Sequence, residues 1–378
     1  LLNKFKNSYK FGDKIDKYKN LTIQKKNLII NSFFKNFSFN LLRPLKAKFK
    51  SFNYLGKELE FSVNKKNKKY DQKIGIILYA DHNLIFLSLI IDLKNNIKIL
   101  GVTEIPVPGS VIGDSLVEDT NELANILLDS INLLDLNNSP LLVILSSSFF
   151  NIHTFFASDL KQVSETDSKV QSKSPYLPGN TILDFLRMSD TKISNSLIRT
   201  VYSNKDFIEG WTNTLEIIDL PVIGLIPAAP HMFDCITSKY QENKTVLIDI
   251  ESNLTTVLIG AKYAELNSHK LPFGSSLYSS LDDRESNVKS YFERVLNSVK
   301  IIMDETNEEL PQYIFVMGLG LDKLVKQGIE LPDSFKRISE LKLSKYLYEP
   351  SKMEIHELIS ESIDSSIDSI ASILSSCI

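Results

Sequence analysis

The chain has 378 residues, of which 43% are hydrophobic and 24% charged, enough for two domain-sized cores and too apolar for disorder throughout. Two cysteines, Cys235 and Cys377, exclude a disulfide framework and a four-cysteine metal site. The sequence shows no signal peptide and no run of eighteen apolar residues long enough to span a membrane. We therefore expect a cytoplasmic protein that is at most peripheral to the inner face of the plasma membrane.

The net charge of −3 conceals an uneven distribution. Residues 1–70 carry 18 Lys or Arg against 4 Asp or Glu, and the rest of the chain carries 25 against 42. Basic tails usually stay solvated, so we expect a poorly ordered extension over residues 1–70. The alternative is contact with an anionic membrane surface. Phosphate binding by the same charges is conceivable, but we expect no nucleic acid partner.

From about residue 71 onward, apolar runs of strand length alternate with stretches of helical period. IGIILYA, LIFLSLIIDL and NIKILGVTEIPV predict three neighbouring strands joined by polar turns. A helix follows, with its apolar face at Leu123, Leu127, Ile131 and Leu134. LLVILSSS is then a strand whose serines, Ser146 to Ser148, we interpret as a strand-loop junction.

The middle of the chain loses its apolar periodicity over residues 158–180, which we interpret as a surface loop or a degraded subdomain. SLIRTVYS then predicts a strand, NKDFIEGWTNTLEIIDL a helix and PVIGLIPAAP another strand. This order of strand, helix and strand is typical of mixed α/β proteins.

The second half repeats this theme. VLIDIESNLTTVLIG predicts a hairpin whose first strand ends at Asp249, followed by a strand near HKLPFG. SNVKSYFERVLNSVKIIMDE predicts a long amphipathic helix, and FVMGLG a strand that ends in glycines. The final stretch, EIHELISESIDSSIDSIASIL, predicts a helix that docks on the body of the protein.

Other common chemistries lack their signatures. The five histidines, His82, His153, His231, His269 and His356, form no HxxxH pattern, and there is no CxxC. Neither a Gly-x-Ser-x-Gly elbow nor a Walker A loop is present. The sequence therefore gives no support to a metal centre, a serine hydrolase or a P-loop enzyme.

The order of IGIILYADHN, VLIDIESNLTTVLIG, LPFGSSLYSSL and FVMGLGLDKL resembles the actin-like ATPase superfamily, and within it the pilus-assembly PilM and cell-division FtsA families. The resemblance covers roughly residues 71–378 and lies in the joint order of the pieces, since each alone is commonplace. It implies an α/β fold of two lobes, actin-like (ribonuclease H-like), with mixed sheets flanked by helices.

The resemblance also implies where ATP and Mg²⁺ would bind if a nucleotide site were retained. Asp249 matches the aspartate that would organise Mg²⁺, and the implied nucleotide-binding residues are Asp249, Thr255, Thr256, Gly274, Gly318 and Gly320.

Two departures from the family pattern weaken that site. Glu251 replaces a glycine, and two like charges about 4 Å apart cost about 4 kcal/mol at an effective dielectric constant of about 20. The first hairpin has Ile77 to Ala80 where the family has Asp-x-Gly and small residues, so Asp81 substitutes only if the turn shifts. Catalytic residues cannot be named from the sequence, and we expect a degraded ATPase.

The resemblance further implies a division of the chain. Residues 71–230 would form the first lobe, with a reduced inserted subdomain near 156–200, and 231–335 the second. Residues 336–378 would return to the body of the protein.

The function that this implies is that of a cytoplasmic scaffold in type IV pilus assembly. It would bind a cytoplasmic segment of an inner-membrane pilus protein, with a pilus motor ATPase and self-association as further contacts. The alternatives are an active ATPase or kinase of the same superfamily and a membrane-associated, filament-forming protein like FtsA.

Overall fold

The computed structural model describes residues 52–54, 57–59, most of 72–337, and 346–348. Within 72–337 the residues left out of the description are 92–96, 114, 157–167, 178, 189–196, 241–243, 262–265, 280–283, 306–309, 312 and 327–330. Most of the basic stretch 1–70 and all of the predicted final helix lie outside the described residues, apart from a short hairpin of β1 (Phe52–Tyr54) and β2 (Lys57–Leu59).

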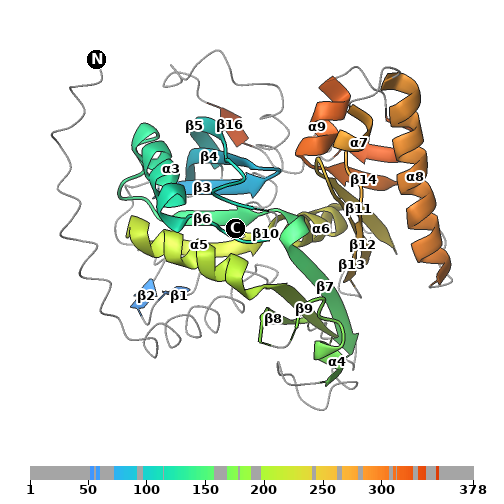
Figure 1. Ribbon diagram of the computed structural model, residues 1–378, viewed down its shortest axis with the longest axis horizontal. Helices are drawn as coiled ribbons and strands as arrows, with labels where there is room; N and C mark the ends of the chain where they lie inside the picture. The colour runs from blue at the N-terminus through green and yellow to red at the C-terminus, as the bar shows by residue number, and fades with distance from the viewer. Residues whose placement is uncertain are drawn as a thin grey trace.

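The first sheet has the strand order β10-β6-β3-β4-β5-β16 (Figure 1). Its strands are β3 (Gln72–Ala80), β4 (Asn83–Ile91), β5 (Ile97–Pro106), β6 (Leu141–Leu145), β10 (Val222–Pro227) and β16 (Tyr346–Tyr348). The antiparallel meander β3-β4-β5 was predicted, and β6 and β10 join it in parallel. Asp81 and His82 form the turn between β3 and β4, and both have positive φ, as a type I′ hairpin turn requires.

Two helices cover one face of the first sheet (Figure 1). They are α3 (Thr120–Leu133), capped by the Asp119 carboxylate, and α5 (Lys205–Ile218), capped by Asn204. The predicted apolar stripe of α3 is buried against the strands, together with Trp211 of α5. The 3.6-residue period thus places these helices where the sequence predicts them.

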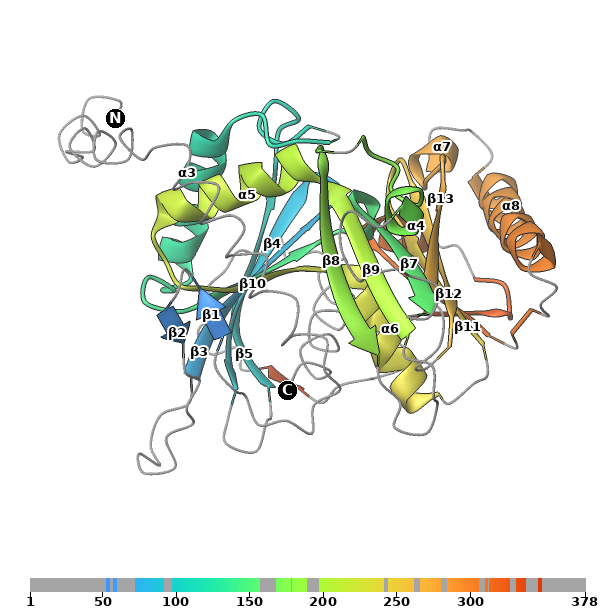
Figure 2. The ribbon, with the colours of Figure 1, turned by 90° about the horizontal axis from the view of Figure 1, so that it is seen from below.

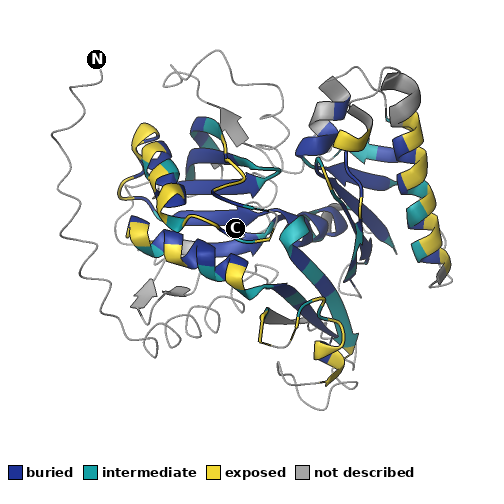
Figure 3. Cartoon of the chain, in the orientation of Figure 1, coloured by how far each residue is buried: buried dark blue, intermediate teal, exposed yellow. Residues whose placement is uncertain are grey.

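The second sheet has the strand order β13-β12-β11-β14-β15. Its strands are β11 (Thr245–Ile250), β12 (Thr255–Gly260), β13 (Leu266–Leu271), β14 (Ile314–Met317) and β15 (Phe335–Arg337). The long helix α8 (Arg284–Glu305) covers the outer face of this sheet. Its buried residues there are Tyr291, Phe292, Val295 and Val299. Figure 3 shows the opposite side of this helix exposed, as its amphipathic pattern predicts. The short α7 (Ser276–Ser279) and α9 (Leu319–Lys326) follow β13 and β14.

Helix α6 (Ala228–Lys239) lies between the two sheets (Figure 2). Its apolar residues Met232, Phe233 and Ile236 belong to one continuous core that includes Ile76 of the first sheet and Leu247 of the second. The two sheets therefore share a core through α6. The predicted lobe boundary at residues 230 and 231 falls within this helix and stays a prediction.

A third, smaller sheet has the order β7-β9-β8, with β7 (Phe150–Phe156), β8 (Thr181–Met188) and β9 (Leu197–Asn204). The helix α4 (Ser168–Gln171) packs on it through Val170. Strand β7 also contacts β13 of the second sheet. The Ile152 N–H donates to Ser268 Oγ at 2.7 Å, and Thr154 Oγ1 donates to the Leu266 carbonyl at 2.9 Å.

Candidate functional site

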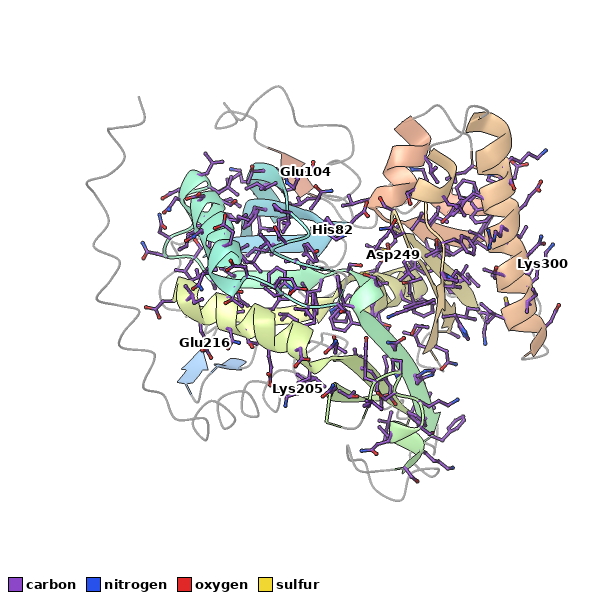
Figure 4. The ribbon with its side chains drawn as sticks, viewed as in Figure 1. His82, Glu104, Lys205, Glu216, Asp249 and Lys300 are labelled. Atoms are coloured by element: carbon purple, nitrogen blue, oxygen red, sulfur yellow. The ribbon has the colours of Figure 1, made fainter. Side chains whose placement is uncertain are left out.

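Asp249 lies at the end of β11, on the side of the second sheet that faces the first (Figure 4). Side chains two residues apart share a face of a strand, so Asp249 lies on the face of Leu247, which packs toward α6. Glu251 follows directly after the strand. Both carboxyl groups are buried, which the sequence alone did not show.

The serine run after β6 provides hydrogen bonds to both carboxyl groups. Ser147 Oγ donates to Asp249 Oδ2 at 2.6 Å and accepts from the Ala229 N–H of α6 at 3.1 Å. Ser146 Oγ donates to Glu251 Oε1 and lies 2.8 Å from Ser148 Oγ. These serines do form the predicted strand-loop junction, but sequence analysis did not connect them to the acids. A run of three serines directly after an apolar strand was the available signal.

The first hairpin reaches the same place through Asp81. Ser252, at the tip between β11 and β12, donates its backbone N–H to Asp81 Oδ1 at 3.0 Å and its hydroxyl to Oδ2 at 2.6 Å. The tips of the two hairpins are therefore joined directly, although 171 residues separate the partners.

The three glycines of the predicted nucleotide site all lie against the loop that contains Glu251 and Ser252. A Cβ added to Gly274 would come within 2.4 Å of the carbonyl oxygens of both residues. One at Gly318, where φ is +110°, would come within 2.2 Å of the Ile250 oxygen and 2.6 Å of an Asp249 carboxylate oxygen. Gly320 would meet Glu251 atoms at 2.7 Å. These glycines allow close approach of the protein's own backbone.

Backbone donors next to Gly274 are directed at the same loop. The Ser275 N–H donates to the Glu251 carbonyl at 2.9 Å, and the Ser276 N–H donates to the Ser252 carbonyl at 2.8 Å. Ser276 Oγ donates to that carbonyl as well, at 2.6 Å. The segment that begins with Gly274 therefore holds the β11–β12 tip in place through hydrogen bonds to its carbonyl groups.

The two threonines of the predicted site take opposite faces of β12. Thr256 lies directly across the ladder from Asp249. Thr255 instead bonds the Phe273 carbonyl at 2.8 Å and the Tyr291 hydroxyl at 2.7 Å, between the sheet and α8. The structure thus brings Asp249, Thr256 and the glycines together and leaves Thr255 in the core behind them.

Burial dominates the electrostatics of this cluster. It raises the pKa of the Asp249 carboxyl, an effect opposed by the Ser147 hydrogen bond and increased by the charge of Asp81. Burial also raises the pKa of the Glu251 carboxyl, and the Asp249 charge adds to this effect. The pair therefore resists carrying two full negative charges.

Lys270 of β13 borders the cluster. Its ammonium group donates to the Ser148 carbonyl at 2.6 Å. Burial lowers the pKa of Lys270 to about 8, although the Glu251 charge acts in the opposite direction. The serine loop is thus bonded to acidic residues on one side and to the half-buried Lys270 on the other.

The residues present do not fit a phosphate group or a bound metal at this tip in the structure described. The tip's Ser252 N–H donates to Asp81, and the glycine surfaces are in contact with residues 249–252. Among the described residues, no three His, Cys, Asp or Glu side chains are grouped so that they could hold a metal ion. No described helix is long and apolar enough to cross a membrane.

No family model and no curated protein sequence matches the chain. A search of solved structures finds a chain of the PilM–PilN type IV pilus biogenesis complex, with a TM-score of 0.60 and 11% identity, covering 82% of this chain and 99% of that one. The chain has the fold of that chain, the two-lobed actin-like arrangement that the sequence resemblance implied. At 11% identity the likeness establishes the fold, and function has to be argued from the site.

The same search also finds two more distant structures. A protein of unknown function with an actin-like ATPase fold, from Bacteroides thetaiotaomicron, gives a TM-score of 0.42 and 11% identity over 80% of this chain and 97% of that one. The cytoplasmic domain of EpsL, an inner membrane component of the type II secretion system of Vibrio cholerae, gives 0.38 and 8% over 79% and 94%. The predicted fold of mixed sheets flanked by helices is confirmed.

Proposed function

We propose that this actin-like chain is a scaffold of a type IV pilus assembly machine that acts without turning over ATP. The observation that carries the proposal is that the tip of the β11–β12 hairpin donates to the protein's own Asp81 carboxylate. A phosphate group needs such donors for itself. A chain that uses them internally has kept the fold for a purpose other than nucleotide chemistry.

The charges at the tip favour the same function. Asp249 and Glu251 are buried side by side, and the Asp81 carboxylate faces them from the other hairpin. A triphosphate brought to this tip would meet the acidic side chains of Asp81, Asp249 and Glu251. Close like charges in a partly buried site cost several kcal/mol in total, of the order of 4 kcal/mol for each pair about 4 Å apart.

The fold likeness supports the choice of partner in this proposal. The similar chain comes from a complex of PilM with PilN. We therefore propose that this chain binds a cytoplasmic segment of an inner-membrane pilus protein of the PilN kind, at the inner face of the plasma membrane. A motor ATPase of the pilus and a second copy of this chain are further proposed contacts.

Calorimetric titration with Mg-ATP tests the loss of nucleotide chemistry. We expect no binding up to millimolar ATP by the wild-type chain. Glu251→Gly removes one acidic group and is the variant in which weak binding would return. An Asp129→Ala variant, altered on the exposed face of α3, should behave as wild type. Micromolar binding by the wild-type chain would overturn the proposal and favour the active ATPase or kinase.

Binding of the partner is tested separately. A synthetic peptide with the sequence of the cytoplasmic segment of the PilN-type protein should bind the full chain, and a scrambled peptide of the same composition should not. We expect Mg-ATP to leave this affinity unchanged. Equal affinity for both peptides would contradict a scaffold role toward this partner, whatever the result with ATP.

A further inference from the structure

The contact between the two hairpin tips has the geometry of a bound oxyanion. Ser252 presents two donors, its backbone N–H and its hydroxyl, and each reaches a different oxygen of the Asp81 carboxylate, at 3.0 and 2.6 Å. Backbone N–H groups at loop tips are common oxyanion-binding groups in proteins. Here the oxyanion is supplied by the chain itself.

The donor side of this contact is held in place from behind. The Ser252 carbonyl accepts from both the N–H and the hydroxyl of Ser276, at 2.8 and 2.6 Å. Ser276 Oγ also lies 3.0 Å from the side-chain oxygen of Asn253. The Glu251 carbonyl shares a peptide plane with the Ser252 N–H and accepts from the Ser275 N–H at 2.9 Å, so this N–H is held toward the first hairpin.

The acceptor side is equally well fixed. Asp81 and His82 have φ values of +53° and +60°, the backbone of a tight two-residue turn that aspartate tolerates better than most residues. Asn83 Nδ2 donates to the Asp81 carbonyl at 3.2 Å, and the Val107 N–H donates to the His82 carbonyl at 2.7 Å. The turn thus presents the Asp81 carboxylate in one orientation.

We propose that the Asp81 carboxylate is an internal oxyanion ligand of the Ser252 tip and latches the two hairpins together. The latch joins the first sheet to the second on the side where the hairpins meet, and it requires neither nucleotide nor metal. It goes beyond the scaffold function, because it concerns the resting conformation of the chain whichever partner binds. An actin-like chain with this latch keeps the tips of its two hairpins closed without a ligand.

Hydrogen exchange at the tip tests the latch directly. In the full chain carrying Asp81→Ala, we expect the Ser252 amide to exchange about tenfold faster or more than in wild type, because a charge-assisted acceptor is lost. Exchange in the middle of α8, on the far face of the second sheet, should not change. Asp129→Ala removes an equal charge from an exposed site and should leave the tip as in wild type.

A second variant keeps the test decisive if Asp81→Ala fails to fold. Asp81→Asn has the same shape and retains one acceptor oxygen, so its Ser252 amide should exchange faster than in wild type but more slowly than in Asp81→Ala. Unchanged exchange at Ser252 in the folded variants would overturn the latch. So would an equal acceleration in Asp129→Ala. Both outcomes are independent of ATP and peptide binding, so they separate the latch from the proposed function.

Discussion

The hairpins β3–β4 and β11–β12 hold corresponding places in the two main sheets, yet their tips differ in what they offer. The first turns in two residues, Asp81 and His82, and offers an acceptor. The second has a longer tip, residues 251–254, and offers donors from Ser252. The donors of the second tip bond to the acceptor of the first, so these polar groups are paired within the protein. The two hairpin tips are thus joined by hydrogen bonds within the protein itself.

The largest expected effect comes from breaking the backbone packing behind the second tip. Gly318→Ala places a Cβ 2.2 Å from the Ile250 oxygen at a φ of +110°, where L-residues are strained. We expect a loss of about 3 kcal/mol in the free energy of unfolding, measured by urea denaturation.

The matched control for Gly318 is Gly109→Ala. An added Cβ at Gly109 would meet nothing within 4 Å, so the free energy of unfolding should change by less than about 0.5 kcal/mol. Similar losses in the two variants would show that close packing at the tip is not the cause.

Removing the serine that links the end of β11 to α6 has a smaller expected effect. Ser147→Ala leaves the buried Asp249 carboxyl and the Ala229 N–H without this partner. We expect a loss of about 2 kcal/mol in the free energy of unfolding. Ser172→Ala, an exposed serine bonded within its own turn, should cost less than about 0.5 kcal/mol. A loss in Ser172→Ala as large as that in Ser147→Ala would contradict this account.

The smallest expected effect is a pH dependence that belongs to the second tip. The pKa of Glu251 is raised in the folded chain above its ordinary value of 4.5, first by burial and then by the charge of Asp249, so the folded state holds the proton more tightly. The stability that this contributes is present below pH 4.5 and is lost as the pH rises toward the folded pKa.

Glu251→Gln should flatten this dependence, which amounts to at most about 1.4 kcal/mol per pH unit. Urea denaturation of both proteins at about pH 5 and about pH 6 measures it, and over this one-unit step the effect stays below that expected for Ser147→Ala. Parallel profiles for wild type and Glu251→Gln would assign the slope to other groups, with the neighbouring Asp249 the first to examine.

Sequence analysis predicted much of the fold because its signals are local. Apolar runs of strand length identified the meander β3-β4-β5, and the 3.6-residue period identified the helices α3, α5 and α8. The order of the pieces then indicated the actin-like arrangement. These features depend on residues that are neighbours in the chain.

The site was less accessible because its contacts are distant in the chain. Asp249 could be placed at a strand end, but Ser147 lies 102 residues before it and Asp81 lies 171 residues before Ser252. Glu251 was expected to direct its charge at a phosphate, and the structure instead has it buried and bonded to Ser146. Which face of β12 carries Thr255 depends on register, which a single sequence does not define.

The core that runs through α6 affects how the protein unfolds. Met232, Phe233 and Ile236 pack with residues of both main sheets, so neither sheet can lose its structure while the other keeps its inner face covered. Unfolding of the two sheets should therefore be coupled in one cooperative transition, with calorimetric and van't Hoff enthalpies in agreement. The two lobes should therefore behave as one cooperative unfolding unit.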